Sequence, residues 1–171
     1  MSKRLNICLA SALFASVQVF SATATLAAGA RGSEAEAQEM VKKAVALIKS
    51  AGPDSAYKTF TEHPSGAFKD RDLYVFVYDF QGICLAQGAN PKIIGKNLIE
   101  LKDADGKPTI SGMIDVVKTK KTGWYGPYRF NNSVTNTLEA KKSYCEQGAG
   151  ETMVCVGAYL GNSLAAATPQ A

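Results

Sequence analysis

Apolar residues recur at helical spacing directly after the first thirty residues of the chain. Residues 33–51 place small and aliphatic side chains three or four positions apart, at Ala37, Met40, Val41, Ala44, Val45, Leu47 and Ile48. Ser33 and Glu36 have the spacing of a capping box, and Gly52 ends the pattern. We therefore predict an amphipathic helix over residues 33–51, followed by a shorter helix over residues 55–63.

Farther along the chain, the pattern changes to short apolar segments that predict strands. Residues 73–80 (LYVFVYDF) are apolar on both faces, which is typical of a central strand. A turn at residues 79–82 leads back into a partner strand and so predicts a hairpin. The remaining expected elements are the partner strand at 83–88, a helix at 108–120, a strand at 124–132 that Pro127 interrupts, a turn at 132–140, and strands at 141–147 and 152–160.

The order of these elements defines the expected fold class. Two helices, two strands, one helix and three strands indicate an α+β fold rather than an alternating α/β fold. We expect one five-stranded antiparallel sheet with the long N-terminal helix across it and loops over its other face. This single domain should cover residues 31–162, followed by a flexible tail of low complexity at 163–171.

The first thirty residues have the composition of a secretory signal peptide. Lys3 and Arg4 precede an apolar stretch at 5–20, and small residues follow as far as Ala30. An uncleaved membrane anchor is the alternative, but polar residues dilute a stretch that is already short for a span of about 20 residues. We expect residues 1–30 to be removed on export, which makes the mature protein periplasmic or secreted.

Three cysteines remain after export, and an oxidising compartment would allow two of them to pair. Cys145 and Cys155 lie in two apolar segments that a short polar turn separates. As opposite members of an antiparallel pair they could form a disulfide, whereas a register shifted by one residue would point the sulfurs apart. Cys84 would then be a buried free thiol.

Charge and motif content exclude several classes of function. Without the two basic residues of the signal peptide, 17 basic side chains face 15 acidic ones, and no basic cluster suggests nucleic acid. Residues 103–106 (DADG) begin like a calcium loop, but Ile114 stands where the bidentate Glu belongs, and His63 has no evident metal partner. Nucleophile, phosphate-loop and haem motifs do not occur. We expect no enzyme activity, no metal and no cofactor.

Several motifs, in this order along the chain, resemble a known family. They are DLYVFVYDFQG at 72–82, NPKIIGKNLIELKDADGKP at 90–108, GW at 123–124, YRF at 128–130, KKSY at 141–144 and VGAYL at 156–160. The chain is similar over nearly its whole mature length to the single Cache domains, the PAS-like extracytoplasmic sensor modules of bacterial receptors, and specifically to their second single-Cache subgroup.

The resemblance implies a PAS-like sheet with a small-ligand pocket between the sheet and its covering loops and helix. Ligands of such domains are often short carboxylates or other small metabolites. Members are commonly fused to a membrane helix and an output domain, whereas this sequence ends about ten residues after its last expected strand. We therefore expect a free-standing sensor that signals through a membrane-bound kinase, receptor or transporter.

A dense aromatic cluster surrounds one cation in the expected strand at 124–132. It contains Trp124, Tyr125, Tyr128, Arg129 and Phe130. Such a group could form the wall of an apolar pocket, with Arg129 binding a carboxylate. On composition alone, ordinary packing of strand aromatics with a solvated Arg129 is the favoured explanation, since aromatics are frequent in strands. The resemblance favours the pocket, because these residues match the strand that lines it.

The next expected strand adds a second candidate pair. Lys142 and Tyr144 share one face of an extended strand, so an ammonium and a hydroxyl could bind the same anion, while Lys141 points away. A solvated, lysine-rich edge strand is the alternative. The expected ligand-binding residues are Trp124, Tyr128, Arg129, Lys142 and Tyr144.

Three functional hypotheses follow from these observations. The first is a periplasmic sensor that binds a small organic anion and passes occupancy to a partner. The second is a thiol-based redox protein of the cell envelope that uses Cys84, Cys145 and Cys155. The third is a structural accessory protein whose pocket has been lost.

Overall fold

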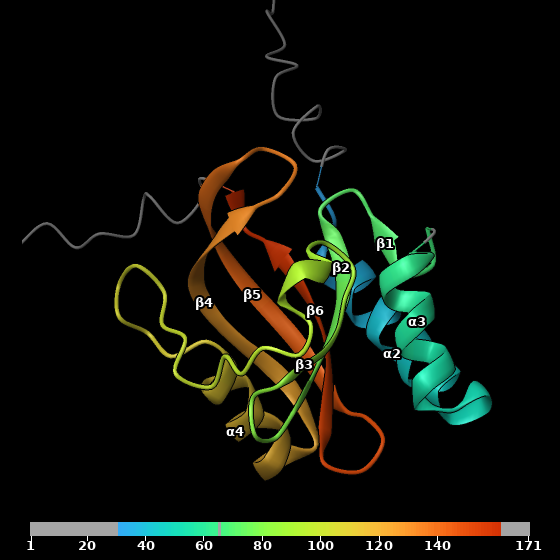
Figure 1. Cartoon of the computed structure of the whole chain (residues 1–171). Helices are drawn as coiled ribbons and strands as arrows, with labels where there is room; N and C mark the ends of the chain where they lie inside the picture. The colour runs from blue at the N-terminus through green and yellow to red at the C-terminus, as the bar shows by residue number, and fades with distance from the viewer. Residues whose placement is uncertain (1–30, 65, 162–171) are drawn as a thin grey trace, which may run out of the picture.

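The computed structural model describes residues 31–64 and 66–161, so the expected signal peptide at 1–30 and tail at 163–171 lie outside the described residues. The helices and strands follow one another in the predicted order (Figure 1). The elements are α2 (Glu34–Ala51), α3 (Pro53–Glu62), β1 (Lys69–Asp70), β2 (Leu73–Asp79), β3 (Cys84–Gln87), the single 3-10 turn η1 (Pro91–Ile93), α4 (Ile110–Lys120), β4 (Thr122–Asn132), β5 (Thr137–Gln147) and β6 (Thr152–Tyr159).

The two N-terminal helices begin and end where their local chemistry requires. The Ser33 side chain accepts a hydrogen bond from the Glu36 backbone N–H, and the Glu36 carboxylate accepts one from the Ser33 N–H, which forms the predicted capping box. Gly52 ends α2 with φ of 82°, a conformation that favours glycine. Pro53 then opens α3 at a position where its missing N–H costs nothing.

The sheet is antiparallel throughout and follows the strand order β1-β2-β6-β5-β4, with β3 paired to β2. The predicted five-stranded α+β architecture is confirmed, and the two-residue β1 adds a short sixth strand at the start of β2. The predicted turn over 132–140 is too long, because β4 runs to Asn132 and β5 starts at Thr137. Leu138 pairs with Asn131 across this hairpin, so the polar residues here belong to a strand ladder rather than a loop.

The sheet separates two apolar layers (Figure 1). On one face, α2 and α3 pack against inward-facing residues of β2 and β6 such as Val75, Val77 and Val156. On the other face, α4 packs against the aromatic side chains of β2 and against Tyr128 of β4. Within residues 31–64 and 66–161, no helix is long and apolar enough to cross a membrane.

Candidate functional site

The alternation of β5 distributes its two lysines to opposite faces of the sheet. Lys142 lies on the face that α2 covers, where its Nζ is 2.6 Å from Glu34 Oε2 in the first turn of that helix. Its Nζ also lies 4.7 Å from the Trp124 ring centroid, and the Trp124 and Tyr144 rings are 5.4 Å apart. Lys141 consequently projects from the opposite face, toward α4.

A bulge in β4 sets which of its aromatic residues reach the α4 face. Tyr125 pairs with Ser143 and Tyr128 pairs with Lys141, so two residues of β4 stand opposite one residue of β5. This extra residue places Tyr125, Tyr128 and Phe130 on the same face, with successive ring centroids 6.1 Å apart. Pro127 sits within the bulge, where a strand tolerates a residue that has no N–H.

Lys141 is the unusual residue of the α4 face, because its side chain is 1% exposed. Its stem lies against Gly157 of β6, where a methyl group would overlap Lys141 Cε. The Nζ atom donates a hydrogen bond of 2.8 Å to the Tyr74 hydroxyl and one of 3.4 Å to the Tyr159 hydroxyl. Among the described residues it forms no ion pair within 4.0 Å.

Aromatic rings enclose this amine on several sides. The Nζ atom lies 4.3 Å from the ring centroid of Tyr74, 4.5 Å from that of Tyr159 and 5.1 Å from that of Phe130. These distances are within the range of cation–π attraction, which partly compensates a charge removed from water. We call Lys141 and these three rings the lysine cage.

Burial of the amine lowers the pKa of Lys141 to about 7, against a weaker opposing effect of the Asp72 carboxylate. Burial also raises the pKa of Tyr74 and of Tyr159, so both hydroxyls stay protonated and neutral. Asp72 is itself buried and accepts a hydrogen bond of 2.6 Å from the Gly32 N–H through Oδ1, while its Oδ2 has no hydrogen-bond partner in the part of the chain that the structure describes. The site therefore holds an amine near its titration point beside two neutral hydroxyls, with the Asp72 carboxylate beyond ion-pair distance.

A cavity of about 40 Å³ adjoins the lysine cage between the sheet, α4 and the loop at residues 90–109. One water-sized sphere needs roughly 10–15 Å³ of such volume, so the cavity has room for a molecule of a few heavy atoms. Its wall is mainly apolar and aromatic, with Gln87, Thr109 and the tyrosines as polar members. The lining residues are Tyr74, Phe76, Tyr78, Gln87, Ile93, Leu98, Leu101, Thr109, Ile110, Met113, Tyr128, Phe130 and Lys141.

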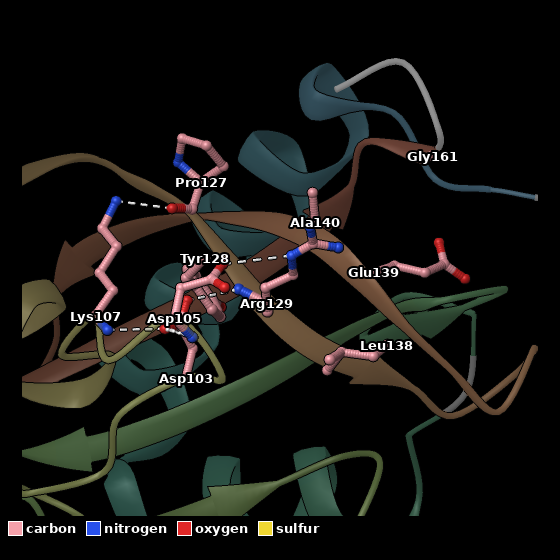
Figure 2. A pocket seen from close by; sticks show the side chains of 10 residues that line it. All are labelled: Asp103, Asp105, Lys107, Pro127, Tyr128, Arg129, Leu138, Glu139, Ala140 and Gly161. Atoms are coloured by element: carbon pink, nitrogen blue, oxygen red, sulfur yellow. Dashed lines mark hydrogen bonds and ion pairs between the residues drawn. The ribbon is translucent and has the colours of Figure 1, made fainter. Parts of the chain in front are cut away.

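A larger and more open groove, of about 220 Å³, surrounds Arg129 at the outer end of β4 (Figure 2). Arg129 Nε is 3.4 Å from Asp105 Oδ2, and Asp103 accepts the Arg129 backbone N–H at 2.8 Å. Lys107 Nζ donates to the Pro127 carbonyl at 2.7 Å. Side-chain exposure of 52% at Arg129 keeps it hydrated. These charges are either paired or in water. We therefore expect the groove to attract an anion more weakly than the cavity does.

The structure thus separates the five residues predicted for ligand binding. Tyr128 lines both the cavity and the open groove, Arg129 lines the groove alone, and Trp124, Lys142 and Tyr144 face α2. Lys142 and Tyr144 do share a face, but the expectation that Lys141 points away from a cavity is wrong. The role of these five residues in ligand binding stays a prediction.

The sequence alone does not place Lys141 at the cavity, because it does not show which face of the sheet each residue of a strand occupies. Both lysines of the KKSY motif fit the pattern equally, and only the neighbouring strands decide which one is buried. One signal was present in the sequence, because Gly157 interrupts an otherwise bulky buried strand and a glycine there marks a close approach of another group.

The cysteines form the predicted cross-strand bridge. Cys145 of β5 and Cys155 of β6 are directly paired in the sheet and joined by a disulfide, and both are buried. Cys84 is a buried free thiol, whose pKa burial raises to about 11. It is therefore protonated at neutral pH and a poor nucleophile. In the described part of the chain, no group of three His, Cys, Asp or Glu side chains is arranged to hold a metal ion.

Comparison with known proteins agrees with this architecture. A family model described as Single Cache domain 2 matches residues 9–168. The chain belongs to the single Cache domain 2 family. Cache domains are extracytoplasmic sensory modules that bind small molecules, so the expected family and class of function are confirmed. A search of curated proteins finds no match.

Three solved structures share the fold. A methyl-accepting chemotaxis protein from Vibrio parahaemolyticus is similar with a TM-score of 0.63 and 22% identity, covering 82% of this chain and 94% of that one. A Cache chemosensory domain described in terms of carboxylic acid recognition has a TM-score of 0.61 and 18% identity, covering 82% and 99%. A periplasmic sensor domain of a chemotaxis protein has a TM-score of 0.57 and 21% identity, covering 80% and 94%.

Proposed function

We propose that this Cache domain binds a short organic anion, a carboxylate of two to four carbons, in the cavity beside Lys141. Occupancy would be passed to a membrane-bound receptor, kinase or transporter. The observation that carries the proposal is the lysine cage, in which a buried amine has hydroxyl and aromatic neighbours but, among residues 31–64 and 66–161, no carboxylate within bonding distance. A bound carboxylate would supply the missing counter-ion and raise the fraction of charged Lys141.

The size and composition of the cavity support a small, partly apolar acid. About 40 Å³ excludes a sugar or a nucleotide in the conformation described, and the apolar wall suits a short alkyl chain. Tyr74, Tyr128 and Thr109 add hydroxyl groups at the cavity, which could orient the second carboxylate oxygen. One of the similar structures is a Cache domain described in terms of carboxylic acid recognition.

A thermal-shift screen tests this proposal. Acetate, propionate and butyrate at about 100 times their dissociation constants should stabilise the fold by roughly 2.7 kcal/mol. Lys141→Met should abolish this shift while leaving the unliganded protein as stable or more stable at pH 7, because it removes the cost of a buried amine. The measurement is the melting temperature with and without each acid.

Arg129→Ala is the matched comparison, because it removes one of the two cations that line the open groove, the other being Lys107, and leaves the cavity intact. The shift should survive this substitution. If Arg129→Ala abolishes stabilisation and Lys141→Met retains it, the groove is the anion site and the cavity is not. If the shift persists in both variants, neither Lys141 nor Arg129 is the cation that binds the acid.

A thiol-based redox function is the second candidate from the sequence. The burial of all three described cysteines and the raised pKa of Cys84 work against it, because thiol exchange needs an accessible thiolate. A structural accessory role gains no specific support, since a protein that had lost its pocket would have no reason to keep a costly buried amine beside a cavity.

A further inference from the structure

Lys141 combines the features of an amine that can form a covalent bond with its ligand. We propose that the lysine cage binds short 2-oxo acids as an imine between Lys141 Nζ and the oxo carbon of the acid. This inference rests on the proposed function, because it places the ligand in the same cavity and narrows its chemical class. It adds a reversible covalent step to what is otherwise an ion pair.

The surroundings of Nζ leave its lone pair available. The titratable groups that face it are Tyr74 from β2, Asp72 from the turn just before β2 and Tyr159 from β6. The Tyr128 hydroxyl of β4 is engaged by Ser143 at 2.7 Å. From α4, the cavity receives only Ile110 and Met113. With a pKa of about 7, roughly half of Lys141 is neutral at physiological pH, whereas an exposed lysine with a pKa of about 10.4 is almost wholly charged.

The reaction balances without an oxidant or a reductant. The Nζ lone pair forms a bond to the oxo carbon while one N–H proton passes to the oxo oxygen, which gives a carbinolamine. With one further proton from solvent the hydroxyl leaves as water while the C=N bond forms, and the remaining N–H proton stays on the nitrogen. The protonated imine and the acid's own carboxylate then neutralise each other. Tyr74 and Tyr159, whose hydroxyls lie 2.8 and 3.4 Å from Nζ, are placed to relay these protons.

The carboxylate explains why an oxo acid fits better than a simple aldehyde. An aldehyde would leave a protonated imine buried without a counter-ion in an apolar cage, which is costly. A 2-oxo acid carries its own counter-ion one bond away, and glyoxylate, with five heavy atoms, is the smallest acid of this class.

The experiment is reductive trapping of the imine with cyanoborohydride. The full-length protein is incubated with glyoxylate, or with glycolate, which has the same number of heavy atoms but a hydroxyl in place of the oxo group. Peptide mapping by mass spectrometry then measures the modified fraction at every lysine. Labelling at Lys141 with glyoxylate should exceed that at any exposed lysine at least tenfold and should be absent with glycolate.

Two variants serve as controls. The Lys141→Met variant should lack the strong labelling seen at position 141. The Lys58→Arg variant, changed on the exposed side of α3, should still be labelled at Lys141 as the native protein is. The labelling rate should rise from pH 5.5 to pH 7.5 as the amine loses its proton. Mapping of the wild-type protein decides the question even if Lys141→Met folds poorly.

The outcomes separate this inference from the proposed function. If acetate and glycolate stabilise the fold through Lys141 but glyoxylate leaves Lys141 unlabelled, the imine is wrong and the anion site stands. If label spreads evenly over exposed lysines, the imine at the cage is also wrong. If no acid stabilises the fold and Lys141 is unlabelled, both proposals fail together.

Discussion

Gly157 determines how Lys141 can lie across the sheet. A methyl group at this position would overlap Lys141 Cε and would stand 2.7 Å from Ser143 Oγ, closer than carbon and oxygen can approach. We expect Gly157→Ala to move the lysine stem, to destabilise the fold by about 1–3 kcal/mol as overpacking does, and to weaken carboxylate binding at least tenfold. Urea denaturation and calorimetric titration with propionate measure the two effects.

A double-mutant cycle shows whether this cost comes from the lysine. In a Lys141→Ala background the main clash is gone, so Gly157→Ala should cost clearly less than in the native background. Equal costs in both backgrounds would mean that Gly157 is required for backbone reasons, and that it does not make room for Lys141.

At the scale of elements, the disulfide joins β5 to β6 beside the cavity without lining it. Cys145 and Cys155 are ten residues apart, and a bridge that closes a loop of this length adds roughly 2–3 kcal/mol in the chain-entropy account. The double variant Cys145→Ala and Cys155→Ala should lose about this much stability in urea while binding propionate with nearly unchanged affinity.

This variant also separates the sensor from the redox hypothesis. A redox protein would lose its function with the bridge even where the fold survives. Single-cysteine variants are the wrong comparison, because they leave a new thiol beside the core and add its own cost. Retained binding in the folded double variant supports a bridge that is structural, and lost binding would contradict it.

The same elements show what the sequence could predict and what it could not. Helix α2, the hairpin of β2 and β3, and the buried β6 follow from periodicity, capping and turn residues, which are local properties. The face on which Lys141, Lys142 and Trp124 lie depends on register. One extra residue in β4 reverses the face for every position after it, and the side that α2 covers is a non-local fact.

For the whole molecule, Lys141 links folding to ligand binding through one proton. Its pKa is about 7 when folded and about 10.4 in an unfolded chain, so above pH 7 the unfolded state binds more protons and stability rises with pH. Cys84 opposes this above about pH 8.5, because its pKa is raised on folding and the unfolded thiol ionises first. Carboxylates with lowered pKa, such as Glu36 at about 2, contribute fully throughout this window.

The free energy of unfolding of the unliganded protein should therefore rise by up to about 1.4 kcal/mol per pH unit between pH 7 and 8.5. Over the same range the affinity for propionate should fall by up to tenfold per pH unit. The signs are opposite because an anion binds the charged amine and the fold prefers the neutral one. Urea denaturation and calorimetric titration at pH 6.5, 7.5 and 8.5 measure both slopes, and binding heats in two buffers report the proton taken up. Lys141→Met should flatten both slopes, and an affinity independent of pH in the native protein would show that the anion does not bind at Lys141.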